Sequence, residues 1–352
     1  GEHDIKTAPD ILQAMQRSAK DGHTGYAPVP GTQGLREIVA AHHQTQAQVP
    51  TSAENVLITP GAQAALFAAH LAACNPHDKA LYIDPYYTTY PGMLRALSLN
   101  PVAIAAKASD GFQPNGASLN AAAQGAASLL INSPNNPTGV VYGQETLEII
   151  ADTCREHDLW LISDEVYASQ VWSGRHITPR SLPGMKERSL IVGSMSKSHA
   201  MTGSRIGWVI GPEDIIAKLS DLATVSNYGV VGFIQDAAEY ALHLGSSAFI
   251  SVSEPFERRR KLALEILKEF PQINVIPPQG AMYLMLDIRS TGLNGEAFAN
   301  ALLEQRKIAV MPGESFGAAA AGHIRVAMTV EDALFSKALK SLCDFATNLA
   351  SK

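Results

Sequence analysis

Short apolar runs alternate with longer amphipathic stretches through most of the chain, and this alternation restricts the fold more than any other feature. We predict strands at Asn55–Thr59, Ala80–Asp84, Pro101–Ala105, Ser128–Asn132, Trp160–Asp164, Leu190–Ser194 and Trp208–Gly211. We predict helices between them at Ala62–Cys74, Thr89–Leu99, Gln144–His157 and Glu213–Thr224. Strands that alternate with helices in this way form a mostly parallel sheet with helices on both faces. The consecutive apolar residues Leu190–Val192 fit a strand buried on both faces.

The pattern changes beyond Pro271, which indicates a second unit. Residues Gly229–Phe270 are predicted to be helical and to lead out of the sheet. Strands are predicted after them at Ile273–Ile276, Met282–Ile288, Ile308–Met311 and His323–Met328, and helices at Gly295–Arg306 and Val330–Ala350. A chain of 352 residues exceeds one simple core. We therefore expect an α/β protein in which residues 24–270 form a large domain with a seven-stranded sheet. Residues 1–23, with a helix near Asp10–Ala19, and residues 271–352 would form a smaller α/β domain.

Composition excludes several classes of partner. The formal net charge is −6, whereas nucleic-acid binding requires a basic surface that replaces phosphate counterions. No apolar run is long enough to cross a bilayer. The three cysteines, Cys74, Cys154 and Cys343, form neither a CxxC pair nor a metal-ligand spacing. We expect reduced thiols, no metal, and a cytoplasmic protein that binds neither nucleic acid nor membrane.

A lysine follows one of the apolar strands. Lys197 ends the motif Ser194-Met195-Ser196-Lys197, at the carboxyl end of the strand, where open α/β sheets bind ligands. A lysine there can form an imine with an aldehyde cofactor if burial and nearby cations lower its pKa. Ser194, Ser196 and Arg205 would then donate hydrogen bonds to a phosphate. On this motif alone, a solvated lysine in a surface loop is an equal alternative.

Two further polar clusters stand at predicted strand ends. Asp164 ends the strand Trp160–Asp164, and a carboxylate there requires a partner such as a pyridinium N–H. Tyr167 could reach the hydroxyl of the same ring; taken alone, Asp164 as a helix cap and Tyr167 as core would be favoured. Asn136 lies in the run Asn132–Gly139, which is first of all a turn signal, but it could also donate to a phenolate oxygen.

Three other elements carry candidate binding groups. Gly61, Ala62 and Gln63 begin a helix after a strand, and free N–H groups at a helix start form an anion site, although an ordinary turn is common there. Tyr87 follows another strand and could stack on a flat cofactor. Arg325 lies inside an apolar strand and requires an anion, either a substrate carboxylate or a structural ion-pair partner.

Taken together, these motifs resemble the class I and II aminotransferases, which are pyridoxal-phosphate (PLP) enzymes of fold type I. The resemblance extends in order along nearly the whole chain through Thr24-Gly25-Tyr26, Leu35-Arg36-Glu37, Pro60-Gly61-Ala62, Asn135–Gly139, Ser163–Tyr167, the lysine motif and Arg325. It implies that an amino group passes from an L-amino acid to a 2-oxo acid by ping-pong chemistry. It also implies PLP as the cofactor.

The resemblance implies a role for each candidate residue. Lys197 would be the Schiff-base lysine and proton shuttle, Asp164 the partner of the ring nitrogen, and Tyr167 and Asn136 the partners of the ring oxygen. Ser194, Ser196, Arg205 and the Gly61–Gln63 backbone would bind phosphate, Tyr87 would stack on the ring, and Arg325 and Asn136 would bind substrate. Tyr26 would reach the phosphate of a neighbouring subunit, which implies a homodimer.

The N-terminal residues depart from the family pattern. Gly1-Glu2-His3-Asp4 resembles the family's Gly-x-Pro-Asp turn, with His3 in place of proline. The resemblance places Gly1 beside the substrate carboxylate, so an upstream segment is expected and the substrate side of the pocket stays open.

Within the family, four stretches most resemble arginine–pyruvate transaminases. They are Ser181–Met185, Ser196–Gly203, Phe233–Ala238 and Asp287–Leu293. A carbon–sulfur β-lyase would use the same PLP residues, and a regulatory domain of aminotransferase type is a further alternative. A nicotinamide dehydrogenase is discounted because no GxGxxG turn follows the first strand.

Overall fold

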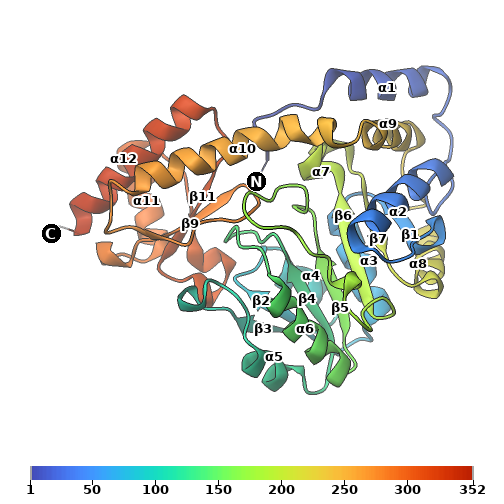
Figure 1. Cartoon of the computed structure of the whole chain (residues 1–352), viewed down its shortest axis with the longest axis horizontal. Helices are drawn as coiled ribbons and strands as arrows, with labels where there is room; N and C mark the ends of the chain where they lie inside the picture. Colours follow the sequence, from blue (N-terminus) through green and yellow to red (C-terminus); the bar gives the residue numbers. More distant parts are fainter. Residues whose placement is uncertain (1, 351–352) are drawn as a thin grey trace.

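The computed structural model describes residues 2–350, which fold around two sheets (Figure 1). The larger sheet has seven strands in the order β1-β7-β6-β5-β4-β2-β3. These strands are β1 Val56–Thr59, β2 Lys79–Asp84, β3 Asn100–Ala105, β4 Ala126–Asn132, β5 Trp160–Asp164, β6 Ser189–Ser194 and β7 Gly207–Ile210. Strand β7 runs antiparallel to both of its neighbours, and the remaining pairs are parallel. The predicted seven-stranded, mostly parallel sheet is confirmed.

Helices cover both faces of this sheet because consecutive strand residues face opposite sides. Helices α3 Ala62–Ala73, α4 Tyr90–Ala96 and α8 Glu213–Ser226 pack on the face that carries Leu190 and Val192. Helices α2 Gln33–Ala47, α5 Gly116–Ala123, α6 Gln144–Glu156 and α9 Gly232–His243 cover the other face. Strands such as β1 and β6 are buried on both sides, which explains their continuous apolar runs, whereas the edge strand β3 is partly exposed.

The smaller sheet is antiparallel and has the strand order β10-β11-β9-β8. Its strands are β8 Asn274–Val275, β9 Tyr283–Asp287, β10 Met311–Pro312 and β11 His323–Ala327. Its core also contains residues of α10 Ser246–Leu267, α11 Gly295–Arg306 and α12 Asp332–Ala350. Figure 1 shows α10 extending from the side of the larger sheet towards this second unit.

The structure differs from the predicted elements at three places. The helix predicted over Gly229–Phe270 is two helices, α9 and α10, because the chain turns at Gly245 with φ +66°. The strand predicted at Ile308–Met311 is wrong except at its end, since only Met311–Pro312 pairs with β11. The third difference is that helices α2 and α5 were not predicted; α5 is capped by Asn115, whose side chain accepts a hydrogen bond from the N–H of Ser118.

The two units are in direct contact beside the carboxyl end of β2. The buried carboxylate of Asp84 accepts the N–H of Ala319 at 3.2–3.3 Å, and the N–H of Tyr86 donates to the carbonyl of Phe316 at 2.9 Å. A side chain on Gly317 would overlap this carboxylate, because its Cβ would lie 2.0 Å from Asp84 Oδ1. This contact fixes where the smaller unit meets the larger sheet.

The N-terminal segment contacts both units. Ile5 packs against the core of the smaller sheet, whereas α1 Pro9–Lys20 packs along α9. Arg259 on α10 is 4% exposed and binds both oxygens of Asp4 at 2.9 and 2.7 Å. It also binds Asp332 of α12 at 2.9 Å and the carbonyl of Met328 at 3.0 Å. One guanidinium therefore joins three segments that are distant in sequence.

We predict that Arg259→Met lowers the free energy of unfolding by about 2–4 kcal/mol, since it leaves partly buried acceptors unpaired. The matched control is Lys261→Met on the same helix, which removes the largely exposed ion pair with Glu257. That change should cost less than about 0.5 kcal/mol. Urea unfolding of both variants measures the difference, and equal losses would contradict the prediction.

Candidate active site

A cavity of about 350 Å³ lies where strands β4, β5 and β6 end. Parallel strands bring their carboxyl ends to one edge, and ligands bind there in open α/β sheets. Ten of the predicted site residues line this cavity: Ala62, Gln63, Tyr87, Asn136, Asp164, Tyr167, Ser194, Ser196, Lys197 and Arg205. Asn132 connects two of the strand ends, because its Nδ2 donates to the carbonyl of Asp164 and its Oδ1 accepts from the N–H of Asn136.

Lys197 lies on α7 Met195–Ser198, a short helix that directly follows β6. The side chain of Ser194 caps this helix by accepting the N–H of Ser196. Burial lowers the pKa of Lys197 to about 8; among the charges, Glu2 opposes this shift while Arg205 and Arg325 add to it. The amine is therefore much closer to its neutral, nucleophilic form at neutral pH than an exposed lysine is.

Asp164 is buried beneath the cavity at the end of β5. Its Oδ2 accepts a hydrogen bond from Tyr90 at 2.6 Å, and its Oδ1 accepts the N–H of Val166 at 3.3 Å. Burial raises the pKa of Asp164 to about 6, although both hydrogen bonds lower it. The protein therefore stabilises the negative charge of Asp164 only in part. A cationic N–H of a ligand binds best to such a carboxylate.

Tyr167, which follows β5, and Tyr283, on β9 of the smaller sheet, line the cavity, and Arg325 of β11 lies beside them. The hydroxyls of Tyr167 and Tyr283 are 2.9 Å apart. Arg325 lies over the rings of Tyr283 and Phe316 at 4.5 and 4.6 Å and donates from Nη1 to Asn136 Oδ1 at 2.9 Å. Its Nε is buried without a hydrogen-bond partner. Among residues 2–350 no carboxylate forms an ion pair with Arg325, so the guanidinium retains capacity for an anion.

Arg205 and the start of α3 form the opposite end of the site. Gly61 precedes α3 with φ +85°, and a Cβ there would lie 2.3 Å from Arg205 Nη2. Glycine is therefore required for the guanidinium to approach the helix N-terminus. Arg205 Nη1 donates to the carbonyl of Thr202 at 2.6 Å. A cation beside free helix N–H groups is suited to a phosphate.

Two other predicted residues are not among those that line the cavity in the described part of the chain. Tyr26 is 89% exposed, does not line this cavity and contacts the ring of Tyr228 edge-on at 5.0 Å. Gly1, predicted beside the substrate carboxylate, lies outside the described residues 2–350.

Three residues of the site were not predicted from the sequence. Tyr90 follows the predicted stacking residue Tyr87 by three positions, and this spacing at a helix start was a usable signal. Tyr283 is a tyrosine in an apolar strand, which requires a partner for its hydroxyl. Glu2 lines the cavity and accepts a hydrogen bond from Thr202 at 2.9 Å; no feature of the sequence indicates this contact.

The residues present fit PLP. A buried lysine with a lowered pKa, a destabilised carboxylate and an arginine at a helix start match the cofactor's aldehyde, ring nitrogen and phosphate. The group that would bind the substrate carboxylate, Arg325, has an orphaned buried Nε beside the same cavity.

Comparison with known proteins agrees with this chemistry. The family model "Aminotransferase class I and II" matches residues 1–342. The chain is 39% identical over 331 residues to an arginine–pyruvate transaminase of Pseudomonas aeruginosa, covering 94% of this chain and 84% of that protein. It is 34% identical over 344 residues to a probable aspartate/prephenate aminotransferase of Thermus aquaticus, covering 97% and 88%. The crystal structure of an aromatic aminotransferase from Pyrococcus horikoshii superimposes with a TM-score of 0.95 at 31% identity, covering 99% of this chain and 94% of that one. These findings favour transamination and give the lyase alternative no support.

We predict that PLP binding weakens about tenfold per pH unit below pH 6, because protonation of Asp164 removes the charge that attracts the ring nitrogen. Tyr90→Phe should shift this pH midpoint upwards, since the Tyr90 hydrogen bond lowers the pKa of Asp164. Cofactor titration of the apoprotein, followed by absorbance from pH 5 to pH 8, measures both effects. A midpoint that is the same in Tyr90→Phe would contradict the assigned role of this hydrogen bond.

Proposed function

The chain belongs to the class I and II aminotransferase family, and from this premise we propose that its amino donor has a cationic side chain, with arginine first and pyruvate as acceptor. PLP-dependent transamination between an amino acid and a 2-oxo acid is the activity of the family. The choice of donor is our proposal. Its first support is the similarity to an arginine–pyruvate transaminase at 39% identity.

The charges around the cavity support this donor independently. The cations at the site are Lys197, Arg205 and Arg325. In the roles proposed here they serve the cofactor aldehyde, the phosphate and the α-carboxylate of the donor. No further lysine or arginine among residues 2–350 lines the cavity, so a second carboxylate on the donor, as in aspartate, lacks a cationic partner. Glu2, in contrast, is an acidic lining residue that the cofactor does not require.

Each site residue has a proposed part in the reaction. When bound, PLP supplies an aldehyde that takes up the amino group and a ring that accepts the electrons of the Cα–H bond. Asp164 holds the proton on the ring nitrogen, and Tyr167 and Asn136 donate to the ring oxygen. Tyr87 stacks on the ring, and Ser194, Ser196, Arg205 and the backbone of Gly61–Gln63 bind the phosphate. Arg325, with Asn136 beside it, binds the α-carboxylate.

Lys197 is the proposed proton carrier. Once free as an amine, Lys197 Nζ would accept the proton from the donor's Cα and release it again, so that one side chain would serve as both base and acid. Its pKa near 8 suits both steps, because the amine accepts and releases a proton near neutral pH.

We extend the proposal to assembly and location. The exposed Tyr26 supports a homodimer in which it reaches the partner's phosphate site. A cytoplasmic location is supported by Cys74, Cys154 and Cys343, which are all unpaired. Among residues 2–350 no helix has the length and apolarity that a membrane span requires. The division at residues 24–270, against 1–23 with 271–352, remains part of the proposal. Its support is Ile5, which packs against the core of the smaller sheet, whereas α1 packs along α9 and α10 contributes to the core of the smaller sheet.

We predict that Lys197→Ala lowers the rate of multiple turnover by at least about 10³-fold, because no other group can carry the Cα proton. Lys186→Ala, which removes an exposed lysine, is the control and should keep full activity. Steady-state coupled assays measure both variants. An undiminished rate in Lys197→Ala would remove this residue from the mechanism.

We predict that L-arginine without an acceptor removes the visible absorption of the lysine-bound cofactor, and that pyruvate restores it. L-aspartate should do so at least about tenfold less efficiently, because its second carboxylate lacks a cation. Single-turnover stopped-flow absorbance gives both rates. If aspartate reacts faster, the donor assignment is wrong while the PLP chemistry stands; if no amino acid changes the spectrum, transamination itself is refuted.

A further inference from the structure

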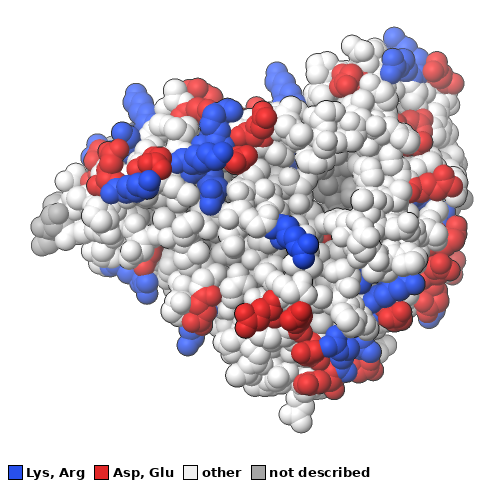
Figure 2. Space-filling model, viewed as in Figure 1, with Lys and Arg blue, Asp and Glu red and all other residues white. Residues whose placement is uncertain are grey.

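A second cavity of about 280 Å³ lies next to the active site, on the other side of Val166 and Ser194, which line both cavities. It is enclosed by α2, strands β6 and β7, the loop after β5 and the junction of α9 with α10. Figure 2, in the same view as Figure 1, shows the surface hollowed between the regions labelled α10 and α2. None of the roles proposed above uses this space.

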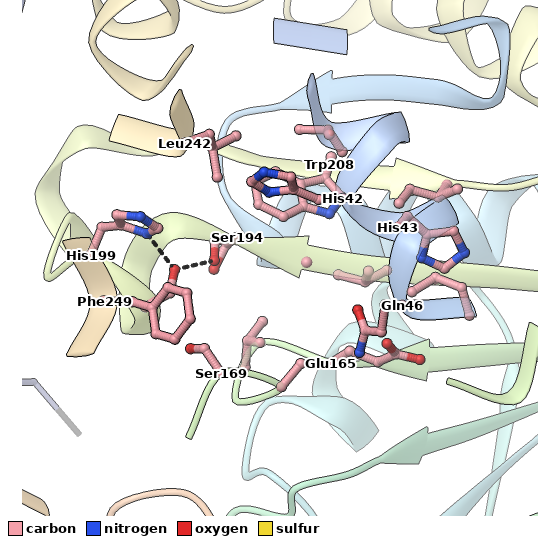
Figure 3. Close-up of a pocket in the computed structure, with 18 of the residues that line it drawn as sticks. His42, His43, Gln46, Glu165, Ser169, Ser194, His199, Trp208, Leu242 and Phe249 are labelled. Carbon is pink, nitrogen blue, oxygen red and sulfur yellow. Dashed lines mark hydrogen bonds between the residues drawn. The ribbon is translucent and has the colours of Figure 1, made fainter. Parts of the chain in front are cut away.

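Three residues that line this cavity carry a buried polar atom without a hydrogen-bond partner. His43 on α2 and His199 after α7 are 5% and 4% exposed, and the Nε2 atom of each is buried without a hydrogen bond. The hydroxyl of Ser169 is buried without a partner as well. Figure 3 shows His199 and His43 on different sides of the cavity, with Ser169 along its lower edge in that view. Buried polar atoms are costly unless they are hydrogen-bonded, so three of them around one space indicate a ligand.

The remaining wall restricts the chemistry of that ligand. Its middle part is apolar, with Val39, Ile191, Trp208, Leu242 and Phe249 among the lining residues. These side chains suit a flat apolar body, and the polar atoms on different sides suit hydrogen-bonding groups at its two ends.

The charges of the wall exclude an anion. No lysine or arginine of the described chain lines this cavity. Glu165 is the charged lining residue, and its oxygens already accept from Ser163, Thr178 and His176 at 2.8–3.0 Å. Burial lowers the pKa of both His43 and His199 to about 4, so both imidazoles are neutral at pH 7. A carboxylate or phosphate would find a carboxylate and no cation there.

We propose that this cavity is a second binding site, which takes an uncharged, flat aromatic molecule with a hydrogen-bonding group at each end. One end binds His199 Nε2 and the other binds His43 Nε2 or the Ser169 hydroxyl. The site is separate from the substrate site but adjoins the segment that carries Lys197.

That segment connects the second cavity to catalysis. His199 Nδ1 is 2.7 Å from Ser198 Oγ, which in turn contacts the carbonyl of Ser194 at 3.4 Å (Figure 3). Ser198 and His199 are the two residues that follow Lys197 in the sequence. Gln170, in the loop that bears Ser169, donates a hydrogen bond to the carbonyl of Lys197. A ligand bonded to His199 therefore holds the turn on which Lys197 lies, and its binding changes the turnover rate.

The probe for this site is 5-hydroxyindole, an uncharged bicycle with an N–H at one end and a hydroxyl at the other. Titration calorimetry of the PLP-loaded enzyme should detect one molecule per chain, and saturating L-arginine should leave its affinity unchanged. Indole, which lacks the hydroxyl, should bind about tenfold more weakly, as expected for one lost hydrogen bond. Failure of 5-hydroxyindole to bind, or its displacement by arginine, would overturn the proposal.

Two variants and a control locate the binding. His43→Phe and His199→Phe each keep a ring while removing one Nε2, and each should weaken binding about tenfold. The control His157→Phe alters a histidine after α6, outside the cavity, and should leave the affinity unchanged. Thermal melting and the cofactor absorbance show that each variant is folded, and either cavity variant alone suffices for the test. Affinity that is unchanged in the folded variants, or a crystal structure with a second copy filling the cavity, would refute the site.

Discussion

The site depends first on a carboxylate buried at the end of a strand in the larger sheet. Asp164 lies where charge is poorly solvated, and burial raises its pKa to about 6 despite a 2.6 Å hydrogen bond from Tyr90. Such a group costs stability in the cofactor-free protein and favours any cation that can reach it. Lys197 follows the end of the neighbouring strand β6. Arg205 and the N-terminus of α3 form a candidate anion site at the same cavity. The pairing of the strands brings these groups together although they are far apart in the sequence.

This arrangement explains how much could be predicted from the sequence. All seven strands of the larger sheet were predicted, because strands buried on both faces are continuous apolar runs. The ten predicted residues that line the active-site cavity were found because groups that follow parallel strands lie together at one edge of the sheet. The short strand β10 and the separation of α9 from α10 were not, because neither has a distinctive period and both depend on tertiary contacts. Tyr90 and Tyr283 carried weaker sequence signals, and the fold identifies their partners as Asp164 and Tyr167.

The distribution of charge divides the cavity between cofactor and substrate. In the proposed roles, three cations and the buried Asp164 would bind PLP or the α-amino acid core that all donors share, so they would not distinguish one donor from another. Discrimination is left to the mouth of the cavity, where Glu2 hydrogen-bonds Thr202. The similar proteins accordingly carry the names of aminotransferases for different amino acids.

The N-terminal segment has a mechanical consequence because it contacts both units. Asp4 is held by Arg259 of α10, and Ile5 is packed against the smaller sheet, whereas Glu2 is bonded to Thr202, close to Lys197. Any rotation of the smaller unit would pull on Asp4 and so displace Glu2 and His3 from the cofactor lysine. Motion of the smaller unit is therefore coupled to the position of the Glu2 carboxylate, which stabilises the positive charge of Lys197.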